Sequence, residues 1–290
     1  MERKQSLWAV AWSIWLLQAS VACAGAPMGP PMATLDEGQW AISAEYGHTE
    51  IDLEAFGTIA QVLGGPQPAT AEILSIENLK TDMVFGNVAY GICDNWDLFL
   101  RAGTADAQGD ATIGASSAGV AGERFGMDGS YGFAWGLGTR ATFCRSGPWS
   151  FGGLLQVTWL DPADSDIRSI DPSVPTIVSV GTADIDFWQT QVALAAVYQI
   201  DAWHLWVGPF LQFVEGDLER RGDILVNGTD SGDFTAKADI EESTQVGVHC
   251  GLNWAISREW NLWTEGQWTS DSWLVGLGVA IAPERAFSEP

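Results

Sequence analysis

Four charged residues recur at regular positions and could form one cluster. Glu45, Arg101 and Glu265 each lie five residues after a tryptophan that opens a segment of alternating residues, and Arg140 has the same parity in a nearby segment. Two carboxylates and two guanidinium groups in a confined space can neutralise one another. The spacing therefore predicts a charge cluster, which is either a structural ion-pair network or a constriction that selects small solutes.

Neutral polar side chains share the parity of these charges. They supply amide and imidazole groups that can donate and accept hydrogen bonds beside the charge cluster. The polar residues predicted to face the same interior are Gln189, Gln191, His249, Asn253 and Gln267.

The elements that must position these residues are strands. Five tryptophans open segments at intervals of 53 to 57 residues: Trp40, Trp96, Trp149, Trp203 and Trp260. From each one, large apolar residues alternate with small or polar residues for about ten positions, which is the period of a β-strand. Five such hairpins predict about ten strands.

The alternation has a direction, because an apolar face stands opposite a face rich in Gly, Ala and Gln. Lipid outside and a polar lumen inside explain this arrangement, and strands in lipid must close into a ring so that all backbone groups are paired. An indole at one height in each hairpin suits a membrane interface, so the five tryptophans are predicted to form an interfacial girdle. Pro209 cannot donate to a ladder, so a local break is expected there.

The connections alternate in length along the chain. Short turns are expected at 94–95, 145–148, 201–202 and 258–259, and long loops at about 50–78, 104–128, 162–184 and 216–240. In transmembrane barrels, short turns face the periplasm and long loops face outside.

The first residues have the features of an export signal. A charged start, Glu2-Arg3-Lys4, precedes an apolar run, and Ala22-Cys23-Ala24 fits a small-x-small cleavage site. We expect a signal peptide at 1–24, a flexible lead-in at 25–37, a barrel domain at 38–283 and a tail at 284–290. The alternative is that Cys23 is retained and lipidated.

Taken together, the signal, the alternating strands, the girdle and the loop asymmetry resemble a small, porin-like bacterial outer-membrane β-barrel protein. The resemblance covers about 38–283 and implies a closed antiparallel transmembrane barrel in the bacterial outer membrane. It also implies the lipid bilayer and the barrel-insertion machinery as partners. The chain departs from the group's usual terminal aromatic residue, since it ends Ser288-Glu289-Pro290.

Net charge limits the other partners. The chain has 13 Lys+Arg against 37 Asp+Glu, a net charge of −24, which repels nucleic acid. Acidic loops suit divalent cations, basic ligands or solubility. The sequence thus favours a narrow porin-like or structural barrel that passes small solutes at most, with a cell-surface recognition or adhesin protein as the alternative.

Enzyme and cofactor chemistry are poorly supported. A hydrolase of the omptin kind needs paired aspartates with a histidine, yet Asp184 and Asp186 have no histidine placed beside them and His48 has outward parity. Residues 227–233 lack the closing glutamate of a calcium loop. We therefore predict no catalytic residues, no metal site and no cofactor, and we expect Cys93 and Cys144 to remain unpaired.

Overall fold

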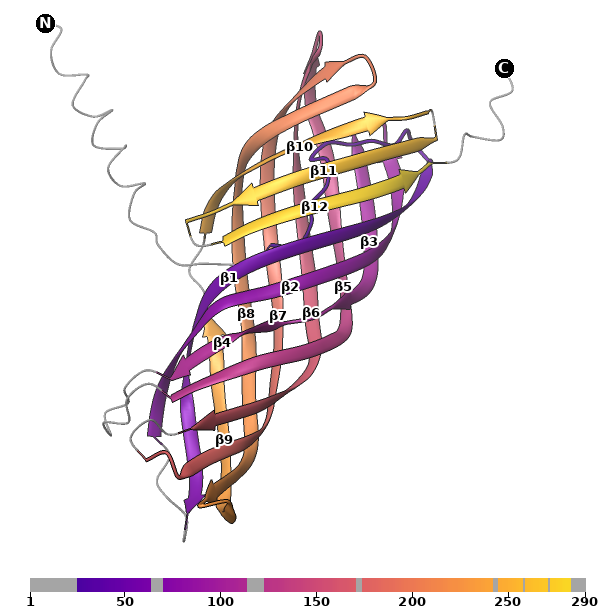
Figure 1. Cartoon of the computed structure of the whole chain (residues 1–290). Helices are drawn as coiled ribbons and strands as arrows, with labels where there is room; N and C mark the ends of the chain where they lie inside the picture. Colours follow the sequence, from indigo (N-terminus) through magenta and orange to yellow (C-terminus); the bar gives the residue numbers. More distant parts are fainter. Residues whose placement is uncertain are drawn as a thin grey trace, which may run out of the picture.

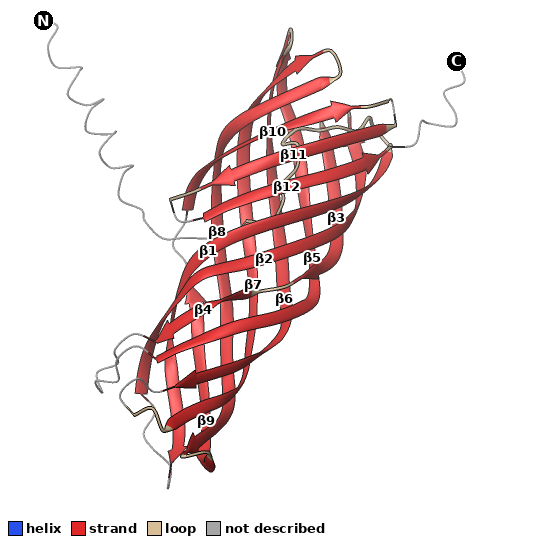
Figure 2. Ribbon diagram, in the orientation of Figure 1, coloured by secondary structure: helices blue, strands red, loops and turns tan. Residues whose placement is uncertain are grey.

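The computed structural model describes residues 25–63, 70–113, 123–170, 174–241, 245–257, 259–270 and 272–282. These residues form one antiparallel sheet of twelve strands (Figure 2). None of their segments is a helix long and apolar enough to cross a membrane. The strands are β1 (Trp40–Leu63), β2 (Thr70–Cys93), β3 (Trp96–Ala105), β4 (Gln108–Ile113), β5 (Glu123–Ser146), β6 (Trp149–Ile170), β7 (Ile177–Ile200), β8 (Trp203–Val226), β9 (Thr229–Glu241), β10 (Gln245–Ala255), β11 (Trp260–Trp268) and β12 (Ser272–Ile281).

The sheet closes on itself at the end where β1, β3, β6, β8 and β11 begin, which we call the tryptophan end. There β1 pairs with β2 on one side and with β12 on the other. The ring continues through β3, β5, β6, β7, β8, β10 and β11, so ten strands close this end. Every strand of this ring therefore has two neighbours, as a membrane requires.

At the opposite end, called the far end, the ring is narrower. Strands β11 and β12 have 9 and 10 residues, whereas β1 has 24, so their hairpin stops partway along the wall. Beyond it β9 pairs directly with β1, from Phe56 opposite Asp239 to Leu63 opposite Gly232. Eight strands, β1, β2, β4, β5, β6, β7, β8 and β9, close the far end. Figure 1 shows β10 to β12 in the upper part of the barrel and β4 and β9 in the lower part.

Two expectations are corrected by this arrangement. The count of about ten strands is too low, because the described residues form twelve: β3 and β4 lie in succession along β2 and β5, and β9 and β10 along β8. The long loops expected at about 50–78, 104–128, 162–184 and 216–240 are largely the far halves of strands.

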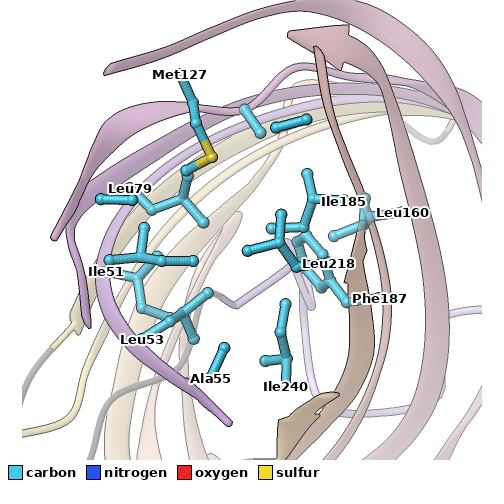
Figure 3. Close-up of a cluster of buried hydrophobic side chains, with 14 of the residues drawn as sticks. Ile51, Leu53, Ala55, Leu79, Met127, Leu160, Ile185, Phe187, Leu218 and Ile240 are labelled. Carbon is cyan, nitrogen blue, oxygen red and sulfur yellow. The ribbon is translucent and has the colours of Figure 1, made fainter. Parts of the chain in front are cut away.

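The far half escaped prediction because its polarity is inverted. Backbone parity continues along β1, but Ile51, Leu53 and Ala55 are buried inside while Glu50 and Asp52 point outward. The inward apolar side chains of the far half form one core inside the eight-stranded ring (Figure 3), where the buried guanidinium group of Arg220 lies over the Phe125 ring. The labelled members are Ile51, Leu53, Ala55, Leu79, Met127, Leu160, Ile185, Phe187, Leu218 and Ile240.

The half nearer the tryptophan end has the opposite polarity. Its outer face carries exposed apolar side chains such as Ile42, Leu100 and Leu137. This band lies between two belts of exposed aromatic residues. The first belt contains the five strand-opening tryptophans, and the second contains Tyr131, Trp159, Phe213, Trp268 and Trp273.

The apolar core predicts unequal effects for two isoleucines on β2. Ile76 is fully buried in the core, whereas Ile73 is about half exposed. Ile76→Ala should lower the free energy of unfolding by about 2–5 kcal/mol because it opens a cavity in a packed interior. Ile73→Ala, the matched control, should change it by less than about 1 kcal/mol. Urea unfolding of the refolded protein in micelles measures both, and equal losses would show that the far half is not packed as described.

Candidate functional site: the plugged lumen

Most of residues 25–37, the segment expected as a flexible lead-in, lies inside the barrel at the tryptophan end, and Asp36 and Glu37 are exposed at its mouth. Ala26, Met28, Ala33 and Leu35 are all buried there, at 5% exposure or less. The segment, which we call the plug, leaves the lumen beside β2, where Gly38 N donates to Gly91 O, and then enters β1. The lumen of this half is therefore filled by the chain's own backbone.

Wall side chains bind the deep part of the plug through its peptide groups. Glu265 accepts from Met28 N at 2.7 Å and from Gly29 N at 3.1 Å. Arg101 Nη1 donates to the carbonyl of Pro27 at 2.9 Å. Peptide groups with no sheet partner are thus satisfied by charged side chains, which form the stronger class of hydrogen bond.

The shallower part of the plug is bound by β3 and β5. Thr34 N donates to Asp97 Oδ2 at 2.7 Å, and Ala33 N donates to Thr142 Oγ1 at 3.2 Å. Asp97, whose side chain is fully buried, was not among the predicted site residues. Its inward parity was readable from β3, but its partner was not, because the plug was not predicted to be inside.

The four predicted charges lie close enough to interact electrostatically, since Arg101 attracts both Glu45 and Glu265 and Glu45 attracts both arginines, but their direct contacts differ. Arg101 lies 3.8 Å from Glu45, but Arg140 pairs with Asp97 at 3.7 Å. Glu265 contacts the plug backbone instead of a guanidinium group. The polar lumen thus holds two direct ion pairs, and Glu265 interacts with Arg101 at longer range.

A layer of glutamines separates this polar lumen from the apolar core. Gln191 Nε2 donates to Gln212 Oε1 at 3.2 Å and to Gln267 Oε1 at 3.0 Å, and Gln156 Nε2 donates to Gln191 Oε1 at 2.5 Å. Gln189 accepts from Gln212. The members of this glutamine layer are all buried: Gln156, Gln189, Gln191, Gln212, Gln245 and Gln267.

His249 and Asn253 face the same interior from β10. His249 Nε2 donates to the carbonyl of Leu194 at 3.1 Å. The ladder between β7 and β8 is interrupted between the pairs Ala193–Phe210 and Ala196–Val207, which agrees with the missing N–H of Pro209. His249 therefore supplies a hydrogen bond to a carbonyl at the interrupted part of the ladder.

Two glycines of the wall allow the plug to approach closely. A Cβ on Gly47 would lie 2.4 Å from Cγ of Pro27, and one on Gly152 would lie 2.5 Å from the carbonyl oxygen of Pro31. Both distances are far below van der Waals contact. Any larger residue at these positions would displace the plug.

Small cavities remain beside the plug at the tryptophan end. One of about 60 Å³ is lined in part by Asn87 and Arg140, and one of about 180 Å³ by His204, Trp206 and Asn253. Each of these side chains has a buried polar atom without a protein hydrogen-bond partner. The cavities are roomy and polar enough for ordered water, which would satisfy those atoms.

The five predicted girdle tryptophans each begin a strand, and their side chains are 38–58% exposed at one end of the barrel. Cys93 and Cys144 are free and exposed. Residues 1–24 and 284–290, with Cys23, lie outside the described residues.

One group of hydrogen-bonded side chains on the outer wall was not predicted from the sequence. Asp82 Oδ1 accepts from Tyr46 Oη at 2.5 Å and from His48 Nδ1 at 2.8 Å, and the His48 ring tilts against Trp273. The sequence did not predict a pairing of His48 with Asp82. The pairing of Asp82 opposite His48 in the β1–β2 ladder could have been found only with the correct register.

Carboxylates gather at one place on the outer wall of the far half, which we call the acidic face. Asp184 and Asp186 on β7 and Asp217 and Glu219 on β8 line a shallow hollow. Burial, followed by repulsion from Asp164 and other carboxylates, raises the pKa of Asp184 above its ordinary value of 3.8. Burial, followed by repulsion from Asp217, raises the pKa of Asp186 as well.

No family model matches the chain, and no curated protein matches it. Its structure is similar to the outer-membrane protease OmpT from Escherichia coli, with 9% identity over 84% of this chain and 97% of that one and a TM-score of 0.44. It is also similar to the outer-membrane protein OprG from Pseudomonas aeruginosa (13%, 86% and 98%, TM-score 0.42). An outer-membrane channel from Pseudomonas putida F1 has 12% identity over 89% of this chain and all of that one, with a TM-score of 0.39. The likeness is one of barrel architecture.

The structure itself has the surface that this architecture requires. Its strands close a ring of paired backbone, and its outer face is apolar between two aromatic belts. The described residues form a closed antiparallel β-barrel with the outer surface of a membrane-spanning one.

The ion pair of Arg101 and Glu45 predicts a non-additive mutant cycle. Arg101→Met leaves the Glu45 carboxylate buried without its cation, so the free energy of unfolding should fall by about 3–5 kcal/mol. Adding Glu45→Gln should recover part of that loss. Urea unfolding of both variants and of Glu45→Gln alone measures the coupling, and strictly additive losses would contradict the pair.

The acidic face predicts a pH-dependent gain from one substitution. The raised pKa of Asp184 means that the folded state binds the proton more tightly than the unfolded state does. This contribution to stability is fully present below pH 3.8 and is lost as the pH rises through the folded pKa. Asp184→Asn should therefore raise the Tm at pH 7 by roughly 1–2 °C and have less effect at pH 3.5.

Thermal scans at the two pH values check this expectation. Asp166→Asn, an exposed change on β6 outside the hollow, is the control. An equal gain from both variants at pH 7 would contradict a specific repulsion around Asp184.

Proposed function

We propose that this protein is a closed outer-membrane barrel that presents its acidic far half at the cell surface, and that it is not an open pore. The observation that carries the proposal is that both halves of the lumen are filled. The plug occupies the half near the tryptophan end, and the apolar core occupies the far half. A solute would have to displace both to cross.

The orientation follows from the connections and the belts. Short turns join strands at the tryptophan end, as at Asp94–Asn95 and Asp201–Ala202, and this end is proposed to face the periplasm. The two aromatic belts then mark the two membrane interfaces, with the first belt as the predicted girdle. The far half, with charged residues outside and apolar residues inside, stands in the water beyond the membrane.

Within this proposal the lumenal charges are structural. Arg101 and Glu265 bind plug peptide groups that have no sheet partner, and Glu45 and Asp97 neutralise the two arginines. Their role is to hold the plug, which replaces the proposed solute constriction.

The acidic face is the surface that we propose the protein presents to a partner. Carboxylates of β7 and β8 converge on one hollow, with Lys237 and Asp239 of β9 at its side. Such a surface attracts cationic partners, including divalent ions, and repels nucleic acid. The partner is therefore proposed to be cationic, and recognition is proposed to occur on strand faces instead of the long loops first expected.

Hydrolysis is a weaker candidate. The Asp82–His48 pair lies on the outer wall near the second aromatic belt, about one-third exposed, and not inside a cavity with a nucleophile. The Asp82–His48 pair is therefore weaker support for a hydrolase than the filled lumen is for a closed surface protein.

Planar bilayer recordings test the closed barrel. The wild-type protein should show no conductance steps, and a variant lacking residues 25–37 should also remain silent because the apolar core still closes the far half. Gel mobility of unboiled samples confirms folding of both. Stepwise conductance in the wild-type protein would contradict the proposal.

Calcium titration tests the acidic face. Wild-type protein should bind Ca²⁺, and Asp184→Asn/Asp186→Asn/Asp217→Asn should weaken binding about tenfold or more, since each charge contributes electrostatically. A matched triple change on other exposed carboxylates, Asp52→Asn/Asp110→Asn/Asp166→Asn, should have a smaller effect. If both triple variants lowered the Ca²⁺ affinity equally, binding would depend on overall negative charge, and a specific role of the acidic face would be contradicted.

A further inference from the structure

A cavity of about 180 Å³ lies between the shallower part of the plug and the wall at the tryptophan end. The plug contributes residues 30–34, and the wall contributes side chains of β7, β8, β10 and β11. Thr34 is exposed, and His204 and Asn261 are half-buried, so the cavity reaches the mouth of the barrel. A small molecule can therefore enter it without displacing the glutamine layer or the apolar core.

Three wall side chains of this cavity carry polar atoms without a protein hydrogen-bond partner. The atoms are Trp206 Nε1, Asn253 Oδ1 and His204 Nδ1. Trp206 is 3% exposed and Asn253 is 8% exposed. His204 lies opposite Asn253 in the ladder between β8 and β10, and Trp206 is the next inward residue of β8. The three side chains are therefore neighbours on one patch of the wall.

The chemistry of these atoms limits what can bind beside them. An indole N–H only donates, so Trp206 needs an acceptor, whereas the side-chain oxygen of Asn253 only accepts and needs a donor. His204 Nδ1 serves in either role, according to its tautomer. A carboxamide presents an acceptor and a donor on neighbouring atoms, so one such group can satisfy Trp206 and Asn253 together.

The remaining lining limits the charge and the size of a ligand. No Asp, Glu, Lys or Arg is among the described residues that line the cavity, so an ion would lose its hydration there without a counter-charge. Pro30, Pro31, Met32 and Val197 supply apolar surface beside the polar atoms. An engineered cavity of about 150 Å³ binds benzene, so this one has room for about six non-hydrogen atoms. A fitting ligand is uncharged and carries a short apolar group next to its amide.

We propose that this cavity is a binding site for a small, uncharged carboxamide that enters from the tryptophan end. The amide oxygen accepts from Trp206 Nε1, the amide N–H donates to Asn253 Oδ1, and the apolar group packs against the prolines of the plug. Such a ligand reproduces the hydrogen bonds that water would make there, so it can displace water without losing them. Because it contacts both the plug and the wall, its binding stabilises the seated plug.

The inference goes beyond the proposed function and rests on it in one respect, that a ligand entering at the tryptophan end comes from the periplasm. Isobutyramide, which matches the cavity in size, is the probe. In protein with isotope-labelled tryptophan in micelles, the indole N–H resonance of Trp206 is identified by its absence from Trp206→Phe. Isobutyramide should shift this resonance with a Kd of about 1–10 mM, which is ordinary for a ligand of this size.

Two molecules of nearly the same shape test the hydrogen bonds in the wild-type protein. Methyl isopropyl ketone keeps the carbonyl oxygen and lacks the N–H, so it should bind at least about tenfold more weakly, because the Asn253 oxygen is left without a donor. Isobutyrate should also bind at least about tenfold more weakly, because it brings a charge into an uncharged lining. Equal affinity for the amide and the ketone would overturn the inference, and so would a Trp206 resonance that isobutyramide does not shift.

Asn253→Ala should abolish the preference for the amide over the ketone, because the acceptor is gone. Asn87→Ala is the matched control, since Asn87 Oδ1 is also buried without a partner but belongs to the lining of the other cavity. The control should keep the preference. A folded Asn253→Ala protein that still prefers the amide would contradict the assigned contact. The three-ligand comparison needs no variant, so it decides the question even where Asn253→Ala does not fold.

Bilayer recordings separate this inference from the proposed function. Binding of isobutyramide to a barrel that conducts would overturn the closed barrel alone. A silent bilayer with a Trp206 resonance that does not shift would overturn this inference alone.

Discussion

The structure depends on one constraint: polar groups sealed inside a barrel must find partners there. The strands satisfy their own backbone by closing a ring, but the wall near the tryptophan end points charged and amide side chains into a narrow space. The plug has the complementary need, since its peptide groups have no sheet neighbour. Glu265 and Arg101 meet both needs by binding plug peptide groups directly.

The change from ten to eight strands divides the molecule into two environments. Where the β11–β12 hairpin ends, the ring narrows and the interior changes from hydrogen-bonded to apolar. The exterior changes in the opposite sense, from the apolar band to the acidic face. Each half therefore fills its interior by a different means, the plug in one and apolar side chains in the other, and the glutamine layer lies between them. A protein built this way is suited to standing in and beyond a membrane more than to conducting through it.

The sequence predicted the half of the barrel in which side-chain type and side-chain direction agree with a lipid exterior. Each of the five spaced tryptophans begins a strand, and the alternation from Trp40 gives the correct inward parity for Glu45. The prediction failed at Ile51, where apolar residues move to the inside without any break in the backbone. An alternating stretch such as Ile51-Asp52-Leu53 still signals a strand, provided that either polarity is allowed.

The plug could not be predicted from periodicity, because its hydrogen bonds go to side chains far away in the sequence. Its Gly and Pro content matched a mobile linker, and only the wall revealed the fit. Pro27 leaves no room for a Cβ at Gly47, and Asp97 accepts a hydrogen bond from the backbone N–H of Thr34.

The central claim is that the plug occupies the lumen, and a cross-link between plug and wall tests it most directly. Ala33→Cys with Thr142→Cys should form a disulfide on mild oxidation of the folded protein, because Ala33 N and Thr142 Oγ1 are 3.2 Å apart. The pair is made with serine replacing the cysteines of the described chain, Cys93, Cys144 and Cys250. Ala33→Cys with Thr139→Cys, whose side chain has outward parity, should not cross-link. Rapid cross-linking of the first pair alone is the predicted result, and a folded barrel in which neither pair cross-links would contradict the account.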